Sequence, residues 1–271
     1  QRHHPGAGCD RSVRRHTAAV TEDAATCLNG IPVTTLERTV VDCARSLAPL
    51  AGLVVADSGL RAGASPEVLR ELLERGATSP GMARARAVVE LADAGSESAW
   101  ETATRFVLLA GGLPRPATQI AVATRLGTFW ADTGWEEWRL LLEYDGRSKY
   151  RGTEDLVREK RRHDAVVEAG HRLLRVTKED VRAPAALLSR VTRLLPADTP
   201  HVRRPHLRAR WPGRVRRTRA RTVRVQAFGA PGAAPSDGKC TARWTHRPRD
   251  DGAMSTVVAL SLVGTQVGGG W

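Results

Sequence analysis

The chain has 271 residues, of which 41% are hydrophobic, so it is long enough for one or two domains with a packed core. Its net charge of +13 is concentrated near one end, because residues 201–271 carry +11 and residues 1–200 only +2. Its apolar runs fall short of the roughly 18 residues that a membrane span needs, and no secretory leader is expected. The sequence predicts a cytoplasmic protein with no membrane partner and a nearly neutral folded part.

Four cysteines, Cys9, Cys27, Cys43 and Cys240, are scattered along the chain. No pair has the C-x-x-C spacing of a zinc site, and the four do not resemble the framework of a small disulfide-stapled domain. We therefore expect reduced thiols without a metal role.

The first part of the chain divides into an irregular and a helical stretch. Residues 1–30 show no sustained apolar period, which predicts a loop or the remnant of an upstream domain. Helix-start signals then recur at Thr35, at Ser65-Pro66-Glu67 and at Ser79-Pro80. Residues 31–95 are therefore predicted to form a helical region.

The next part alternates helices and strands. A capping box from Ser98 to Glu101 begins a helix that should end near Ala110. The elements expected after it are strands at 119–124, 126–132 and 139–145, a helix at 153–169, a strand at 171–176 and a helix at 177–195 with a kink at Pro184. The order helix, three strands, helix, strand, helix predicts an α/β domain with a mixed sheet over residues 96–197.

The composition changes abruptly at Asp198. Arginine, proline, glycine and alanine dominate residues 198–271 without an amphipathic period, which predicts a disordered, Arg-rich tail. Two interpretations of this tail remain open. It could bind nucleic acid loosely through the phosphates, or it could be an extension without a selected function.

The best candidates for catalytic or metal-binding residues lie around the predicted hairpin. Side chains alternate along a strand, so Glu143 and Asp145 should share one face. A hairpin centred near residues 137–138 would place Asp132 across from Glu143. Carboxylates at that distance repel one another unless a positive charge lies between them. The sequence therefore predicts a cation near these three acids.

A hard divalent cation fits this arrangement, because Mg²⁺ prefers oxygen ligands and is often held by one or two carboxylates together with substrate phosphate. Such a site suits phosphodiester hydrolysis. Glu101 could add a ligand or orient water, and Lys149 or Lys160 could stabilise developing negative charge. The alternatives are that these acids bind no metal, and that Glu101 and Arg105 form an ordinary i,i+4 ion pair on a helix.

A family resemblance runs through the same part of the chain. The segments that carry it are Ser96-Glu-Ser-Ala-Trp-Glu101 with Arg105, Gly112-Leu-Pro-Arg-Pro116 with Gln119, Asp132-Thr-Gly-Trp135, Leu142-Glu-Tyr-Asp-Gly-Arg-Ser-Lys-Tyr150, Arg158-Glu-Lys-Arg161 with Asp164, and Gly170 with Leu174-Arg-Val-Thr177. The sequence resembles the endonuclease-like domains related to very-short-patch repair endonucleases, in the PD-(D/E)XK restriction-endonuclease-like superfamily. Residues 30–45 are similar to the helical region that precedes such domains, often after an antitoxin-type winged helix.

This resemblance implies a restriction-endonuclease-like core and a nuclease that depends on Mg²⁺ or Mn²⁺ and acts on DNA. It assigns Asp132 and Glu143 to the metal-binding acids and Glu101 to the acid on the first core helix. Asp145 stands where the superfamily has its catalytic lysine, so that role would pass to Lys160 or Lys149. The alternative is a non-catalytic DNA-binding or toxin–antitoxin regulatory protein that uses a degenerate nuclease fold.

Overall fold

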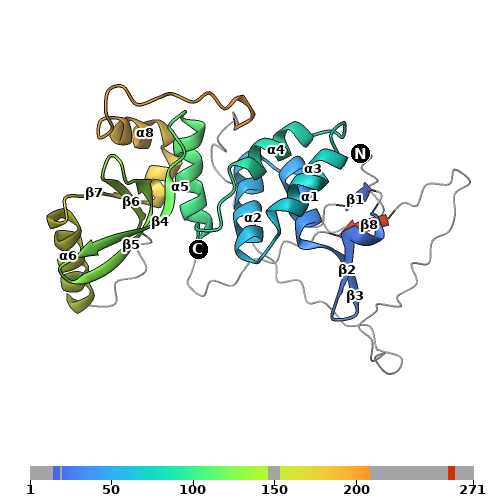
Figure 1. Cartoon of the computed structure of the whole chain (residues 1–271), viewed down its shortest axis with the longest axis horizontal. Coiled ribbons are helices and arrows are strands. Elements are labelled where there is room, and N and C mark those ends of the chain that lie inside the picture. Colours follow the sequence, from blue (N-terminus) through green and yellow to red (C-terminus); the bar gives the residue numbers. More distant parts are fainter. Residues whose placement is uncertain (1–14, 19, 146–152, 208–255, 260–271) are drawn as a thin grey trace, which may run out of the picture. The chain divides into compact units, whose positions relative to one another are not determined.

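The computed structural model describes residues 15–18, 20–145, 153–207 and 256–259, and these form two compact units (Figure 1). The described residues up to Thr35, together with 256–259, belong to the first unit. Residues from Leu36 to 207 belong to the second unit, which contains every predicted site residue that the structure describes.

The first unit consists of two antiparallel strand pairs and a short 3-10 turn. Strand β1 (Arg15–Ala18) pairs with β8 (Thr256–Ala259), and β2 (Ala25–Leu28) pairs with β3 (Ile31–Thr34). Asn29 and Gly30 join β2 to β3 with positive φ values of 49° and 77°, which suits a two-residue hairpin turn. Strands therefore replace part of the predicted loop, the first four residues of the predicted helical region and residues 256–259 of the predicted tail. The Asn-Gly turn specifies the β2–β3 hairpin, which a search for long apolar periods misses.

The second unit begins with four helices in the predicted helical region. They are α1 (Leu36–Ser46), α2 (Pro49–Arg61), α3 (Pro66–Arg75) and α4 (Met82–Glu90). Ser65 caps α3 by accepting the Val68 N–H at 3.3 Å, and Pro66 occupies the first helical position. Helix α1 packs against α2, α3 and α4. The fully buried side chains of Val40, Leu53, Leu69 and Val88 form the core between these helices.

The predicted mixed α/β architecture is confirmed in the rest of the unit (Figure 1). Its elements are α5 (Ala99–Ala110), β4 (Ala117–Thr124), β5 (Gly127–Trp135), β6 (Leu140–Tyr144), α6 (Thr153–Glu168), β7 (Arg172–Val176), α7 (Lys178–Arg182) and α8 (Pro184–Thr192). The sheet order is β4-β5-β6-β7, antiparallel except for the parallel β6–β7 pair. The last predicted helix is two helices, because Pro184 starts α8 and cannot continue α7.

Helices cover both faces of this sheet. Leu141 of β6 packs with Val166 of α6 in one buried cluster. Tyr144 lies an odd number of residues from Leu141 and so points to the opposite face, where its ring stacks on Trp100 of α5 with centroids 5.5 Å apart. Helices α5 and α6 therefore lie on opposite faces of β6.

Residues 198–207 correct the predicted start of the tail. Val202 donates its N–H to the Gly112 carbonyl at 2.8 Å, and the Arg204 guanidinium donates to the carbonyls of Leu109 and Leu113. Leu109 belongs to the last turn of α5, and Gly112 and Leu113 follow this helix directly. Leu207 is buried. An Arg-rich composition therefore concealed a segment that caps a helix, while 208–255 and 260–271 lie outside the described residues.

Among the helices that the structure describes, none has both the length and the apolar character to cross a membrane.

Candidate functional site

Asp132 stands where the pairing of β5 is interrupted. The β5–β6 register ends at the pair of Thr133 with Leu142, so the pairing of Asp132 with Glu143 stays a prediction. On the other side, β4 pairs with β5 at Thr118↔Thr133 and at Ile120↔Ala131, and Gln119 between them has a φ of 49°. Irregular positions of this kind re-aim side chains next to active sites.

The Asp132 carboxylate uses this break to reach the neighbouring strand. Its Oδ2 atom accepts the backbone N–H of Tyr144 at 2.7 Å. A side-chain oxygen thereby takes the place that a backbone carbonyl has in a regular ladder. The half-buried carboxylate is thus held at the level of the sheet.

Glu101 is fixed in the first turn of α5 by a reciprocal cap. Its N–H donates to Ser98 Oγ at 3.2 Å, and the Ser98 hydroxyl donates back to Glu101 Oε1 at 2.8 Å. Its Oε2 accepts the N–H of Glu97 at 2.7 Å. Burial raises the pKa of Glu101, and the negative charge of Asp132 raises it further. The structure therefore brings these two predicted site acids close enough for their charges to interact.

This coupling predicts how Glu101→Gln changes stability with pH. A raised folded-state pKa gives a stabilising contribution that is complete below the ordinary pKa of the carboxyl and is lost as pH rises through the raised value. Glutamine does not titrate, so the stability of Glu101→Gln relative to the parent should increase from about pH 4 to about pH 7. Urea unfolding at both pH values measures the difference. A difference that does not change with pH would contradict the coupling, and Glu74→Gln, at an exposed acid of α3, is the control.

Glu143 is largely buried and binds a cation from α6. The Arg162 guanidinium forms an ion pair with Glu143 Oε1. Arg162 also donates to the Trp130 carbonyl at 3.1 Å, and its guanidinium carbon lies 5.4 Å from the centre of the Phe129 ring. Contacts to a carboxylate, a carbonyl and an aromatic face together hold Arg162 over β5 and β6.

Arg162 was not among the predicted site residues, although its spacing from Val166 on α6 indicates which way it faces. It lies four residues before Val166, whose side chain belongs to the buried cluster on the sheet. Residues four apart share one helix face, so Arg162 continues the sheet-facing side of α6. A charged residue at the end of that face requires a partner on the sheet, and Glu143 is the partner that the structure provides.

The other predicted site residues are placed differently. Asp145 donates its backbone N–H to the Val176 carbonyl at 2.9 Å, which fixes its main chain beside β7. Lys160 is exposed on α6. Lys149 lies outside the described residues. In the part of the chain that the structure describes, no three His, Cys, Asp or Glu side chains gather closely enough to hold a metal ion.

As carboxylates, Asp132 and Glu143 are of the type of ligand that a hard divalent cation prefers. Mg²⁺ keeps several waters and is usually bound through one or two carboxylates plus phosphate oxygens. Asp132 and Glu143 supply two carboxylates from adjacent strands, and Glu143 already holds a positive group, the Arg162 guanidinium. A cation would be held by Asp132 and Glu143, and the remaining ligands would come from water and phosphate.

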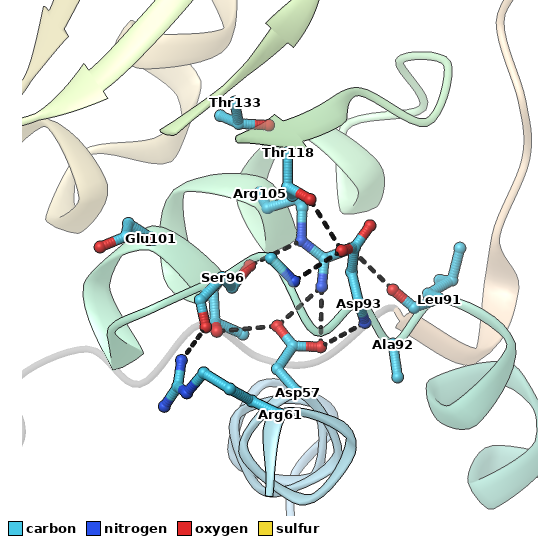
Figure 2. Close-up of polar contacts among 12 residues, drawn as sticks. Asp57, Arg61, Leu91, Ala92, Asp93, Ser96, Glu101, Arg105, Thr118 and Thr133 are labelled. Atoms are coloured by element: carbon cyan, nitrogen blue, oxygen red, sulfur yellow. Dashed lines mark hydrogen bonds and ion pairs between the residues drawn. The ribbon is translucent and has the colours of Figure 1, made fainter. Parts of the chain in front are cut away.

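Arg105 does not pair with Glu101, which corrects the alternative of an i,i+4 ion pair. Its Nη2 atom instead contacts both carboxylate oxygens of Asp57 on α2, at 2.8 Å from Oδ1 and 2.7 Å from Oδ2 (Figure 2). Arg105 also donates to Ser96 Oγ at 3.2 Å and to the Leu91 carbonyl at 2.7 Å. The two charged side chains are at most 1% exposed.

The Asp57 carboxylate is hydrogen-bonded from several directions, which is what a buried charge requires. Besides Arg105, it accepts the Thr102 hydroxyl at 2.8 Å and the Asp93 N–H at 2.9 Å. Arg61, one turn after Asp57 on α2, donates to the Ser96 carbonyl (Figure 2). These contacts tie the predicted helical region to the start of α5, the helix that carries Glu101.

Comparisons with known proteins identify similar proteins but indicate no activity. The fold defines a mixed α/β protein, and no family model and no solved structure matches the chain. Two Mycobacterium tuberculosis proteins are similar to it: Uncharacterized protein MT2308 (strain CDC 1551 / Oshkosh) and Uncharacterized protein Rv2248 (strain ATCC 25618 / H37Rv). Each is 31% identical over 161 residues, which cover 58% of this chain. The chain spans 59% of the length of these relatives.

Proposed function

We propose that the chain is a divalent-metal-dependent, nuclease-like protein that hydrolyses DNA phosphodiester bonds. The observation that carries this proposal is the position of Asp132. Its carboxylate lies at a break in the strand ladder, where it accepts the Tyr144 N–H, and its charge raises the pKa of Glu101. Acids from α5 and β5 thus interact at this end of the hairpin.

The topology supports the same proposal. A helix, three antiparallel strands, a crossover helix and a parallel fourth strand follow one another as α5, β4, β5, β6, α6 and β7. This is the order expected for the restriction-endonuclease-like core that the resemblance implies. Fold alone does not establish an activity, so the proposal depends on the carboxylates.

In this proposal Asp132 and Glu143 bind Mg²⁺ or Mn²⁺ together with a phosphate oxygen. When bound, the cation polarises the phosphoryl group and lowers the pKa of a water molecule. Glu101, whose pKa is raised by burial and by the charge of Asp132, would be the residue that accepts a proton from water. Asp145 is an auxiliary acid, and Lys160 or Lys149 stabilises negative charge on the phosphate.

DNA cleavage by the full-length chain tests this function. Supercoiled plasmid and single-stranded DNA are incubated with the purified protein and Mg²⁺, Mn²⁺ or a chelator. We expect cleavage with either cation and none with the chelator. A preparation that leaves both substrates intact with both cations, or that cleaves equally with the chelator, contradicts the proposal.

The second candidate is a non-catalytic DNA-binding or toxin–antitoxin regulatory protein with a degenerate nuclease fold. Two observations favour it: the Glu143 carboxylate is engaged by Arg162, and Asp145 stands where the resemblance implies a catalytic lysine. This function predicts DNA binding that a chelator does not weaken, and no Mn²⁺ binding by calorimetry. Micromolar to millimolar Mn²⁺ binding that is lost in Asp132→Asn would exclude it.

A further inference from the structure

A cavity of about 390 Å³ lies where the chain after α8 returns to the end of α5, beside the hydrogen bond from the Val202 N–H to the Gly112 carbonyl. His201, Arg203 and Arg204 line it, and none of the described residues that line it is acidic. A cavity of this size suits a small ligand. We propose that it binds a small organic phosphate, such as a mononucleotide, at a site separate from the acids of the hairpin.

Arg204 brings unused hydrogen-bond donors to this cavity. Its Nη1 atom donates to the carbonyls of Leu109 and Leu113 at 2.9 and 2.8 Å, which fixes the side chain. A guanidinium has five N–H donors, and within the described part of the chain the Nε and Nη2 groups of Arg204 have no hydrogen-bond partner. Neither nitrogen is shut off from solvent. Two adjacent N–H groups of this kind bind two oxygens of one phosphate.

The charges around Arg204 favour an anion. Burial lowers the pKa of Arg204; the negative charge of Glu90 opposes this shift, and the positive charge of Arg115 adds to it. Among the described residues, neither Arg203 nor Arg204 has a carboxylate partner in an ion pair. A partly buried cation without a paired carboxylate is stabilised by an anion that binds from solution.

The rest of the lining suits the body of an organic ligand better than a bare ion. Ala110, Val202 and Pro205 contribute apolar surface, and 40% of Val202 is exposed. Gly112 has a φ of 88°, and a Cβ there would collide with the His201 ring, so the glycine lets the imidazole lie against the end of α5. Apolar walls with a few convergent polar groups are typical of small-molecule sites. The phosphate would lie at the two arginines and the rest of the ligand along the apolar wall.

Calorimetric titration of the full-length chain at constant ionic strength tests the site. The probes are deoxyadenosine monophosphate, inorganic phosphate and acetate. We expect the mononucleotide to bind most tightly, inorganic phosphate more weakly and acetate most weakly. Hydrogen bonds to charged groups are the strong ones, so Arg203→Gln should weaken mononucleotide binding about tenfold, and Arg204→Gln should weaken it further.

Matched variants separate this site from a general charge effect. Arg158→Gln removes the same charge from an exposed position on α6, on the other face of the sheet from α5, and should leave the affinity unchanged. Ala110 is the exposed last residue of α5. Ala110→Glu places a carboxylate at the arginines, whereas Ala110→Gln adds the same bulk without charge, so the glutamate should bind the mononucleotide at least about tenfold more weakly than the glutamine.

Each remaining outcome decides the inference. If Arg204→Gln lacks a thermal unfolding transition, because it also loses its contacts to α5, Arg203→Gln and the Ala110 pair decide. The absence of binding of any probe in the millimolar range, or equal weakening by Arg203→Gln and Arg158→Gln, overturns the site. Inorganic phosphate that binds as tightly as the mononucleotide, or a phosphorylated oligonucleotide that binds where the mononucleotide does not, overturns the small organic ligand. None of these results depends on DNA cleavage.

Discussion

Arg105→Met is expected to lower the free energy of unfolding by about 3–5 kcal/mol, because it leaves the Asp57 carboxylate buried without its charged partner. Asp57 is 1% exposed and reaches Arg105 at 2.7 Å. Removing the cation also leaves the Leu91 carbonyl without this donor. Urea or thermal unfolding of the full-length protein measures the loss.

Two comparisons make this result specific. Arg125→Met removes an ion pair with Glu168 in which both side chains are more than half exposed, and we expect almost no change, because water screens such pairs. The double substitution Asp57→Leu with Arg105→Met removes both charges together, and it should restore much of the stability lost in Arg105→Met. Equal losses for Arg105→Met and Arg125→Met would show that the buried pair is not a major stabilising contact.

The second large effect is expected at Asp132. Metal-assisted stabilisation of a phosphoryl transition state contributes several kcal/mol, and each 1.36 kcal/mol corresponds to a factor of ten in rate. We therefore expect Asp132→Asn to slow DNA cleavage on the order of 100-fold or more. Mn²⁺ binding should weaken in the same variant.

Asparagine is the informative substitution at this position. Its amide oxygen can still accept the Tyr144 N–H, which now reaches Asp132 at 2.7 Å, so the hairpin should remain folded. The control is Glu137→Gln, an exposed acid in the turn of the same hairpin, and its cleavage rate should equal that of the parent. If Asp132→Asn cleaves DNA as fast as the parent, Asp132 does not take part in cleavage.

The hairpin around Asp132 was largely predictable. The position of the turn predicted the hairpin, and the register of Thr133 with Leu142 confirms where its strands pair. The break at Asp132 was not predictable, because Gln119 gives no sign of its positive φ. Only the pairing of three strands showed that the carboxylate turns toward the Tyr144 amide.

The partners of the arginines were the least predictable part of the site. A long charged side chain reaches many acids, and sequence spacing favours neighbours such as Glu101 for Arg105. The structure gives Arg105 a partner 48 residues away and Arg162 a partner 19 residues away. Which acid an arginine meets depends on how the helices pack, and local periodicity does not contain that information.

The sequence by itself determined most elements of the second unit and their order, because helix caps, apolar periods and strand alternation act over a few residues. It also identified the acids of α5, β5 and β6 as candidate site residues. The tertiary structure alone decided that Glu143 is held by Arg162, that Asp57 and Arg105 join α2 to α5, and that residues 198–207 cap α5. Those outcomes depend on contacts between distant segments, whose geometry is fixed only when the helices and the sheet pack together.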